Sequence, residues 1–142
     1  MRILQVALML GALSLLAGSR QSLPEMCDQM VYQDSNQLAP PVMDLGLAEG
    51  VVQDDYRGLR MPMACVGVFT EPDHKRVAVG KADQRGRFAL SGVPAGTYRL
   101  VATYPSFCPA NQTVRIVGKR GKTALVHMSV RGIDTCSWID NR

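Results

Sequence analysis

Two chain reversals are encoded in residues 83–100, which read DQRGRFALSGVPAGTYRL. The first begins with Asp83 and ends with Gly86, the residue types that a tight turn prefers at those positions. In the second, Pro94 presets φ and lacks an N–H group, while Gly96 can adopt the positive φ at which a Cβ would clash. The stretch therefore predicts a strand, a turn and a second strand, each placed by local chemistry.

Apolar residues in and around this stretch alternate as they do in half-buried strands. We expect Phe88, Tyr98 and Leu100 to point into one layer between two sheets, and Val77 and Val79 to share one face of another strand. Seven short strands recur at intervals of roughly ten residues, with no helical period. They cover 50–54, 64–69, 77–79, 88–90, 98–103, 114–116 and 125–130. This pattern predicts an all-β fold, a seven-stranded antiparallel β-sandwich.

The same stretch carries a longer motif. Asp stands three residues before Gly, followed by Gly-x-Phe and then Val-Pro-x-Gly-x-Tyr-x-Leu, and the upstream half matches too. Its upstream positions are Gly50, Val51, Val52, Asp54, Gly58, Pro62, Ala64, Val66 and Val68. In these residues the chain resembles the carboxypeptidase regulatory-like domains of the prealbumin-like (transthyretin-like) group. The resemblance implies a Greek-key sandwich over residues 50–131 and a non-catalytic module for folding, spacing or contact, here expected as a free-standing copy.

Residues 1–19 have the pattern of a secretory signal peptide. Arg2 gives a positive start, an apolar run follows, and Ala17-Gly18-Ser19 supplies the small residues that predict cleavage after Ser19. A retained anchor is the alternative, but the run is shorter than the about 20 apolar residues of a membrane span. A bacterial lipoprotein would carry its lipid-bearing Cys at the position of Ser19, and without a thiol there is no group to acylate. We expect a secreted or periplasmic bacterial protein with no membrane span in the mature chain.

The flanks of the expected sandwich show little regular pattern. Residues 20–49 are expected to form an irregular N-terminal extension, broken at Ala39-Pro40-Pro41, that Cys27 ties to the domain. Residues 132–142 are expected to be a C-terminal tail. Neither flank predicts a second domain.

Four cysteines, at positions 27, 65, 108 and 136, lie in the expected mature chain, and none forms a C-x-x-C pair. An even number in an oxidising compartment predicts two disulfides with three possible connectivities, and buried free thiols are the alternative. Strand topology favours one pairing. Cys108 precedes the sixth expected strand, and Cys136 follows the seventh, which runs antiparallel to the sixth. We therefore expect Cys108–Cys136 and Cys27–Cys65.

Charge is unevenly distributed along the chain. Residues 20–73 hold nine acids and three bases, whereas residues 74–142 hold three acids and twelve bases. A basic surface could meet a polyanion, or the acidic segment could lie over the basic half and neutralise it. The bases stand singly on strand-like segments, without a cluster of stacking aromatics. We therefore expect no binding to nucleic acid.

Residues suited to catalysis are absent from the motif. No Gly-x-Ser-x-Gly elbow, phosphate loop or dinucleotide fingerprint occurs. The broad fold also includes hydroxyisourate hydrolases, which end in Tyr-Arg-Gly-Ser, and intradiol dioxygenases, which need two Tyr and two His on iron. This chain ends in Ser137–Arg142 and has only two His. We expect no enzyme and no cofactor.

Three positions are candidate metal ligands or modification sites. His127 lies on the last expected strand and could join His74 or Asp83 at a metal, although a strand His more often faces solvent. Asp83 alone is insufficient for calcium. Asn111-Gln112-Thr113 fits a glycosylation acceptor. We expect no bound metal.

Two functional hypotheses follow from the sequence. The first is a structural or protein-interaction module of the bacterial envelope, and the second is a small-ligand or polysaccharide binder. Tyr56, Tyr104, Phe107 and Trp138 are the aromatics that the core does not use. We expect a contact surface formed by Tyr104, Phe107 and Trp138, near the Cys108–Cys136 end.

Overall fold

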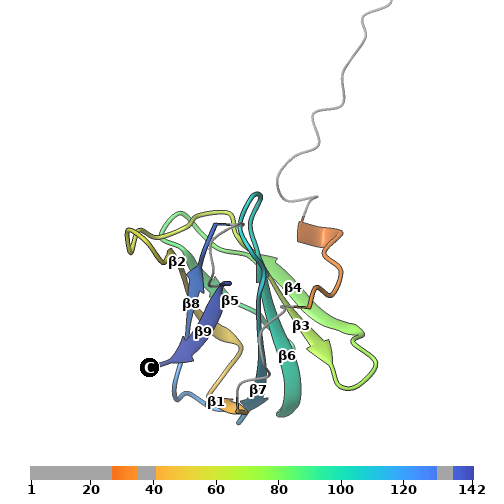
Figure 1. The fold of residues 1–142 in the computed structure, drawn as a ribbon. Coiled ribbons are helices and arrows are strands. Elements are labelled where there is room, and N and C mark those ends of the chain that lie inside the picture. The colour runs from red at the N-terminus through yellow and green to blue at the C-terminus, as the bar shows by residue number, and fades with distance from the viewer. Residues whose placement is uncertain (1–26, 35–40, 131–135) are drawn as a thin grey trace, which may run out of the picture.

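The computed structural model describes residues 27–34, 41–130 and 136–142. Nine strands fall within these residues, arranged in two facing sheets (Figure 1). The strands are β1 (Met43–Leu45), β2 (Glu49–Asp54), β3 (Cys65–Thr70), β4 (Arg76–Lys81), β5 (Arg87–Ala89), β6 (Gly96–Thr103), β7 (Ala110–Ile116), β8 (Ala124–Met128) and β9 (Trp138–Asn141).

The two sheets form a β-sandwich, which confirms the predicted all-β class. Sheet A has the strand order β1-β7-β6-β3-β4, and sheet B has the order β5-β2-β8-β9. The expectation of purely antiparallel sheets is wrong, because β1 pairs with β7 and β2 pairs with β8 in parallel. Parallel partners need a long connection between them, and strand-by-strand patterning does not reveal such partners.

The expected number of strands was also too small. All seven expected strands are present, and β1 and β9 are added to them. β1 lies inside the predicted irregular extension, and β9 lies inside the predicted tail. They are only three and four residues long, so they offer almost no alternation to read. Their places are fixed instead by Leu45 and Ile139, which are buried in the core.

The core fills the space between the sheets. Phe88, Tyr98 and Leu100 lie together in it, as predicted. The Tyr98 hydroxyl donates a hydrogen bond of 2.8 Å to the carbonyl of Pro94, so the second predicted turn is tied to the strand that follows it. Gly86 has a φ of 71°, and a Cβ there would lie 2.6 Å from the Val52 carbonyl oxygen. The motif therefore builds the sandwich, as its residue types indicate.

Several expectations lie outside the described residues. These are the signal peptide 1–19, its cleavage after Ser19, the break at Ala39-Pro40, and the first part of the tail. Among the residues that the structure describes, no helix is long and apolar enough to cross a membrane.

Candidate functional site

The outer face of sheet A is covered by a segment of the same chain. This segment, residues 27–34, is called the strap, and Cys27 ties it to Cys65 of β3 with 5.2 Å between their Cα atoms. A second apolar cluster lies beneath the strap, outside the main core. Its members are Met30, Phe69 and Val101, with Tyr32, Cys65 and Val79 packed against them. The strap thus turns an outer sheet face into a buried one.

A glycine makes room for the strap. A Cβ on Gly67 would lie 2.9 Å from the Met30 sulfur and 2.8 Å from a ring carbon of Phe69. Val79 packs into this outer cluster, and Val77, on the same face of β4, is 36% exposed. The shared face predicted for Val77 and Val79 is therefore the outward one, close to the strap.

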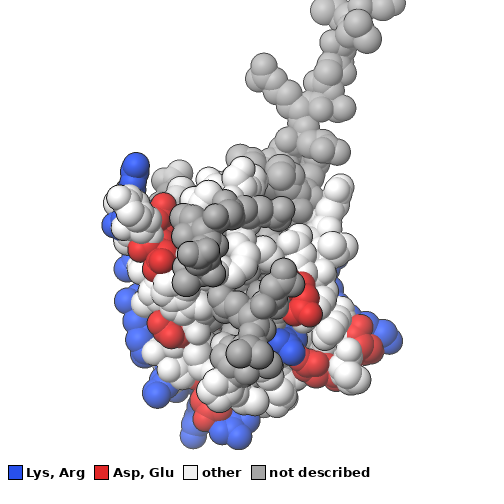
Figure 2. All heavy atoms as spheres, in the orientation of Figure 1, with Lys and Arg blue, Asp and Glu red and all other residues white. Residues whose placement is uncertain are grey.

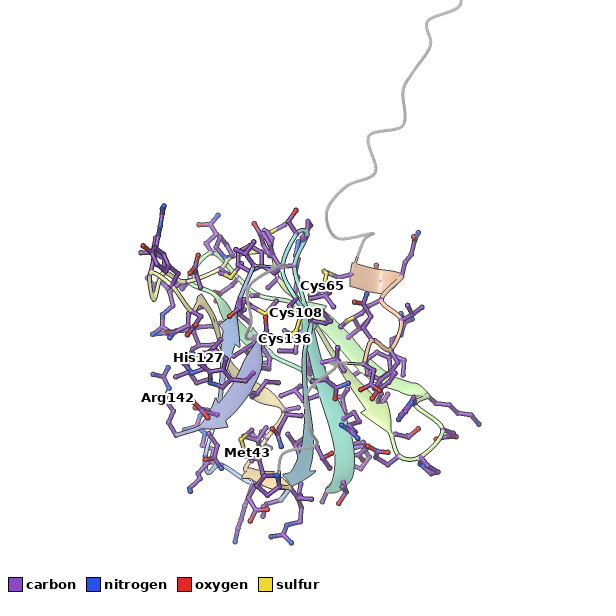
Figure 3. The ribbon with its side chains drawn as sticks, viewed as in Figure 1. Met43, Cys65, Cys108, His127, Cys136 and Arg142 are labelled. Atoms are coloured by element: carbon purple, nitrogen blue, oxygen red, sulfur yellow. A yellow bond between two sulfur atoms is a disulfide. The ribbon has the colours of Figure 1, made fainter. Side chains whose placement is uncertain are left out.

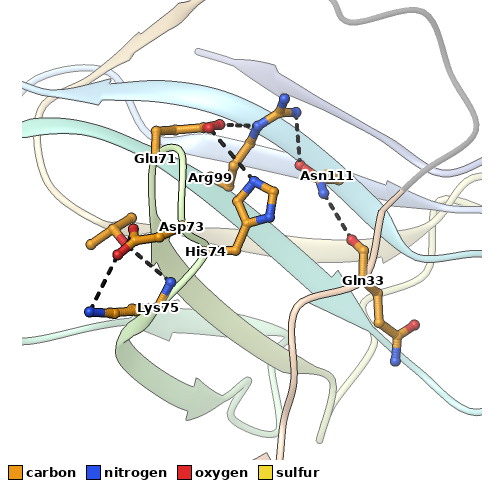
Figure 4. Close-up of polar contacts among 8 residues, drawn as sticks. Gln33, Glu71, Asp73, His74, Lys75, Arg99 and Asn111 are labelled. Carbon is orange, nitrogen blue, oxygen red and sulfur yellow. Dashed lines mark hydrogen bonds and ion pairs between the residues drawn. The ribbon is translucent and has the colours of Figure 1, made fainter.

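Polar side chains fasten the strap along its length. Arg76 donates hydrogen bonds to the carbonyls of Asp28 and Met30, and the Asn111 amide donates one of 2.8 Å to the Gln33 carbonyl. Figure 4 shows the Asn111 contact within a larger network: Arg99 bonds both Asn111 and Glu71.

The same network argues against Asn111 as a glycosylation site. Asn111, the glycosylation candidate, is only 4% exposed and uses its amide nitrogen on the strap. An attached sugar would have no room there.

The outer face of sheet B carries no such cover within the described residues. The register places Gln53, His127 and Trp138 side by side across β2, β8 and β9. The His127 ring stacks on the Trp138 indole, with centroids 4.7 Å apart and planes 14° apart. Figure 3 shows His127 on this side of the sandwich.

Two carboxylates flank the His127 ring. Nδ1 lies 3.8 Å from Asp55 and Nε2 lies 3.2 Å from Asp140, and the side chain is 13% exposed. The Nε2 contact has the distance of an ion pair but not the alignment of a hydrogen bond. Because the carboxylates approach opposite ring nitrogens, they orient the ring and cannot share one metal ion with it. Among the described residues, no group of three His, Cys, Asp or Glu side chains could hold a metal.

The other residues proposed to join His127 lie elsewhere. His74 stacks on Tyr32 of the strap at 3.7 Å and lies 3.6 Å from Glu71, on the sheet A side. Asp83 accepts hydrogen bonds from the backbone N–H groups of Arg85 and Arg87, at 2.8 and 2.9 Å. The bond from Arg87, then that from Arg85, lowers the pKa of Asp83. His74 and Asp83 therefore have structural tasks of their own.

Cys108 and Cys136 also lie together, with 5.5 Å between their Cα atoms. Both disulfides are thus the pairs that strand topology favoured. Because Cys108 precedes β7 of sheet A and Cys136 precedes β9 of sheet B, this second bridge connects the two layers of the sandwich. Ser137 supports it from within: its hydroxyl donates to the Cys108 carbonyl and accepts a bond of 2.7 Å from the Ser129 N–H.

The predicted aromatic contact surface is not a single platform. Tyr104 and Phe107 meet edge to face at 5.5 Å, and both pack against the main core. Trp138 lies apart from that core, on the outer face of sheet B against His127. The fourth candidate, Tyr56, is by contrast 90% exposed.

Tyr56 sits on a well-organised turn, residues 54–60, called the Tyr56 loop. The Asp54 carboxylate accepts the N–H groups of Tyr56 (2.7 Å) and Arg57 (3.0 Å), and its carbonyl accepts that of Gly58 (2.7 Å). Leu59, 58% exposed, closes the turn by accepting a bond from the Asp54 N–H. The signal was in the sequence, since an Asp followed by a Gly four residues on is a turn pattern.

The protein is thus a two-sheet β-sandwich in which the motif of residues 83–100 forms two turns and part of the core. The sequence model of the carboxypeptidase regulatory-like domain matches residues 48–129, and the chain belongs to this family. No curated protein matches the chain. The strap, β1 and β9 lie outside the matched residues, and each disulfide joins one cysteine inside the match to one outside it.

Proposed function

We propose that this chain is a non-catalytic, exported β-sandwich module that makes protein–protein contacts in the bacterial cell envelope. The observation that carries the proposal is the Tyr56 loop, which presents Tyr56 and Leu59 to solvent on a turn already fixed by hydrogen bonds. A loop ordered before binding loses little conformational entropy when it binds. Tyrosine and arginine are also the residue types that most often dominate protein interfaces.

The charge of the Tyr56 loop specifies the kind of partner. Arg57 and Arg60 are exposed, and neither forms an ion pair with another described residue. Asp54 uses its carboxylate inside the turn, and Asp55 lies near His127. The loop therefore suits an apolar depression with an acidic rim, because rim charges of opposite sign steer and orient a partner.

The absence of an enzymatic role is part of the proposal and rests on how the titratable groups are used. His127 is oriented between two carboxylates, and the Asp83 carboxylate is bonded to backbone N–H groups. Export is supported by the two disulfides, which persist in oxidising compartments.

A carbohydrate-binding function is the second candidate, and one observation favours it. The outer face of sheet B combines the Trp138 indole with the polar side chains of Gln53, His127 and Asp140. Aromatic rings beside carboxylates and amides are the groups that bind sugars. Trp138 is only partly exposed, however, so less of its ring is presented than of Tyr56.

Site-specific photo-crosslinking in an expressing bacterium tests the proposal. A photoreactive residue at position 56 is expected to give a discrete protein adduct, whereas one at Val42, which is 56% exposed on another part of the molecule, is expected to give none. With the adduct partner purified, Tyr56→Ala should weaken binding about 30-fold, as for a central interface residue. Val42→Ala is the matched control and should not change it.

Two results would overturn the protein-contact proposal. One is the same adducts from positions 42 and 56. The other is binding of a purified envelope glycan that Trp138→Ala abolishes and Tyr56→Ala leaves intact, which would establish the carbohydrate alternative.

A further inference from the structure

The loop between β7 and β8 is the most basic surface segment that the structure describes outside the features above. Residues 117–122, called the cationic loop, read Val-Gly-Lys-Arg-Gly-Lys, and all six are exposed. The loop precedes β8, whereas the Tyr56 loop meets the other end of that strand through a bond from the Asp55 N–H to the Met128 carbonyl. The two loops therefore lie at opposite ends of the sandwich.

The cationic loop is held in place by its backbone. The Gly46 N–H donates to the Lys122 carbonyl, and the Gly118 N–H donates to the Gly46 carbonyl, both at 2.9 Å. A Cβ on Gly46 would lie 2.3 Å from the Gly121 nitrogen and 2.5 Å from the Lys119 carbonyl oxygen. This close approach between residue 46 and the loop fixes where the loop's side chains project.

Among the described residues, the cations of the cationic loop have no acidic side chain as an ion-pair partner. Lys119, Arg120 and Lys122 form no ion pair with any described residue, and the nearby Asp44 already pairs with Arg115 at 2.7 Å. Two backbone bonds between Thr123 and Arg142, of 2.9 and 3.0 Å, place the backbone of Arg142 at the same end. Figure 2 shows Lys and Arg side chains along the left and lower edges of the molecule, with Asp or Glu atoms beside those at the lower edge.

The composition of this end narrows the choice of ligand. Val117, 47% exposed, stands beside the cations of the cationic loop. Residues 117–122 contain no aromatic side chain on which a base or a sugar ring could stack. Cations around an exposed apolar residue suit the headgroup region of a bilayer, where anionic phosphates attract Lys and Arg and an apolar side chain can enter the interface.

We infer that the cationic loop docks on a membrane surface that carries anionic phospholipid headgroups. This contact is separate from the proposed protein contact and would orient the molecule, with the cationic loop on the bilayer and the Tyr56 loop facing away from it. The attraction is electrostatic, so it weakens as salt is added.

Vesicle co-sedimentation of the exported protein, purified as the host processes it, tests this inference. Vesicles with about one third phosphatidylglycerol are expected to bind the protein, and vesicles of phosphatidylcholine alone are not. Each basic residue near an anionic surface strengthens binding about fivefold, so the triple variant K119Q/R120Q/K122Q should bind about 100-fold more weakly. All three side chains are exposed, so the melting temperature should stay unchanged.

A matched triple variant separates the loop from bulk charge. R57Q/K81Q/R85Q removes an equal number of charges from exposed positions of the Tyr56 loop and the β4–β5 turn, whose Gly86 lies against Arg60 at the other end of the molecule. This variant should bind phosphatidylglycerol vesicles within about threefold of the unchanged protein, because distant exposed charges are screened.

Four outcomes would overturn the inference. These are no binding to the anionic vesicles, equal binding to neutral vesicles, equal losses in the two triple variants, or tighter loop-dependent binding to soluble polyphosphate than to vesicles. Because the assay contains no protein partner, its result does not depend on the proposed protein contact.

Discussion

The strap and β9 are both additions to the family domain, yet they are attached in different ways. The strap lies across the outer face of sheet A and is held mainly by side chains. Met30 of the strap packs beside Phe69, and backbone carbonyls of the strap accept hydrogen bonds from Arg76 and Asn111. β9 instead joins the ladder of sheet B and places Ile139 in the main core. Each carries one cysteine of a disulfide, or lies next to it.

This contrast indicates a different role for each disulfide. A strand that pairs along its backbone and fills the core is stabilised cooperatively with the rest of the domain. A segment with its own small apolar cluster has little to hold it when its covalent link is lost, since local stability follows local burial and hydrogen bonding. We therefore expect the strap to open separately from the sandwich and β9 to unfold only with it.

We expect the largest loss of stability when the buried apolar side chain of an added segment, Ile139 in β9 or Met30 in the strap, is shortened. Ile139→Ala should lower the free energy of unfolding by about 2–5 kcal/mol, because Ile139 is 5% exposed in the main core. Met30→Ala should mainly detach the strap and lower global stability by less than about 2 kcal/mol, because strap opening limits the loss. Urea denaturation of both variants measures the two values.

Equal losses of unfolding free energy in these two variants would show that the strap belongs to the same cooperative unit as β9. Val77→Ala serves as the control on the outer face of β4, where a partly exposed side chain should cost about 0.5 kcal/mol or less.

We expect the second-largest loss of stability when each disulfide is removed in turn. Replacing Cys27 and Cys65 by Ser should cost about 2–4 kcal/mol, since the bridge closes a long loop of the unfolded chain. Amide exchange should become fast in the strap and stay slow in β3. The corresponding pair at Cys108 and Cys136 should cost a similar amount but leave β9 protected, because its backbone pairing with β8 remains.

Hydrogen exchange followed by mass spectrometry distinguishes the two variants. Continued protection of residues 27–34 without the Cys27–Cys65 bridge would show that side-chain packing alone holds the strap. Loss of β9 protection without the other bridge would show that its strand pairing is too weak to persist.

The sandwich was predictable because its signals are local. The turns at Asp83–Gly86 and Pro94–Gly96 need particular residue types, and Phe88 alternates with exposed neighbours in a way that survives in the structure. β1 and β9 were missed because their positions depend on partners far away in the sequence. The parallel pairing of β2 with β8 was missed for the same reason.

Among the candidate sites, too, some features follow from local sequence and others depend on residues far away in the chain. Tyr56 was recognisable as an aromatic outside the core, and the turn around it follows from Asp54 and Gly58. The stacking of His127 on Trp138 could not be predicted, since it requires the register between β8 and β9. The strap likewise depends on Gly67 meeting Met30 across 37 positions of sequence, which no periodic pattern encodes.

We expect the smallest loss of stability from a change on the outer face of sheet B, where β9 presents the only tryptophan of the chain. His127→Gln should lower the free energy of unfolding by less than about 1.5 kcal/mol, because it removes one aromatic stack and the contacts of the imidazole with two partly exposed carboxylates. Trp138 fluorescence should change, since its ring loses the imidazole against it, and should stay constant when Cys27 and Cys65 are replaced. A loss above about 3 kcal/mol would mean that the His127 contacts, and not the backbone ladder, hold β9 in place. That result would make the two appended segments alike, each held by its side chains.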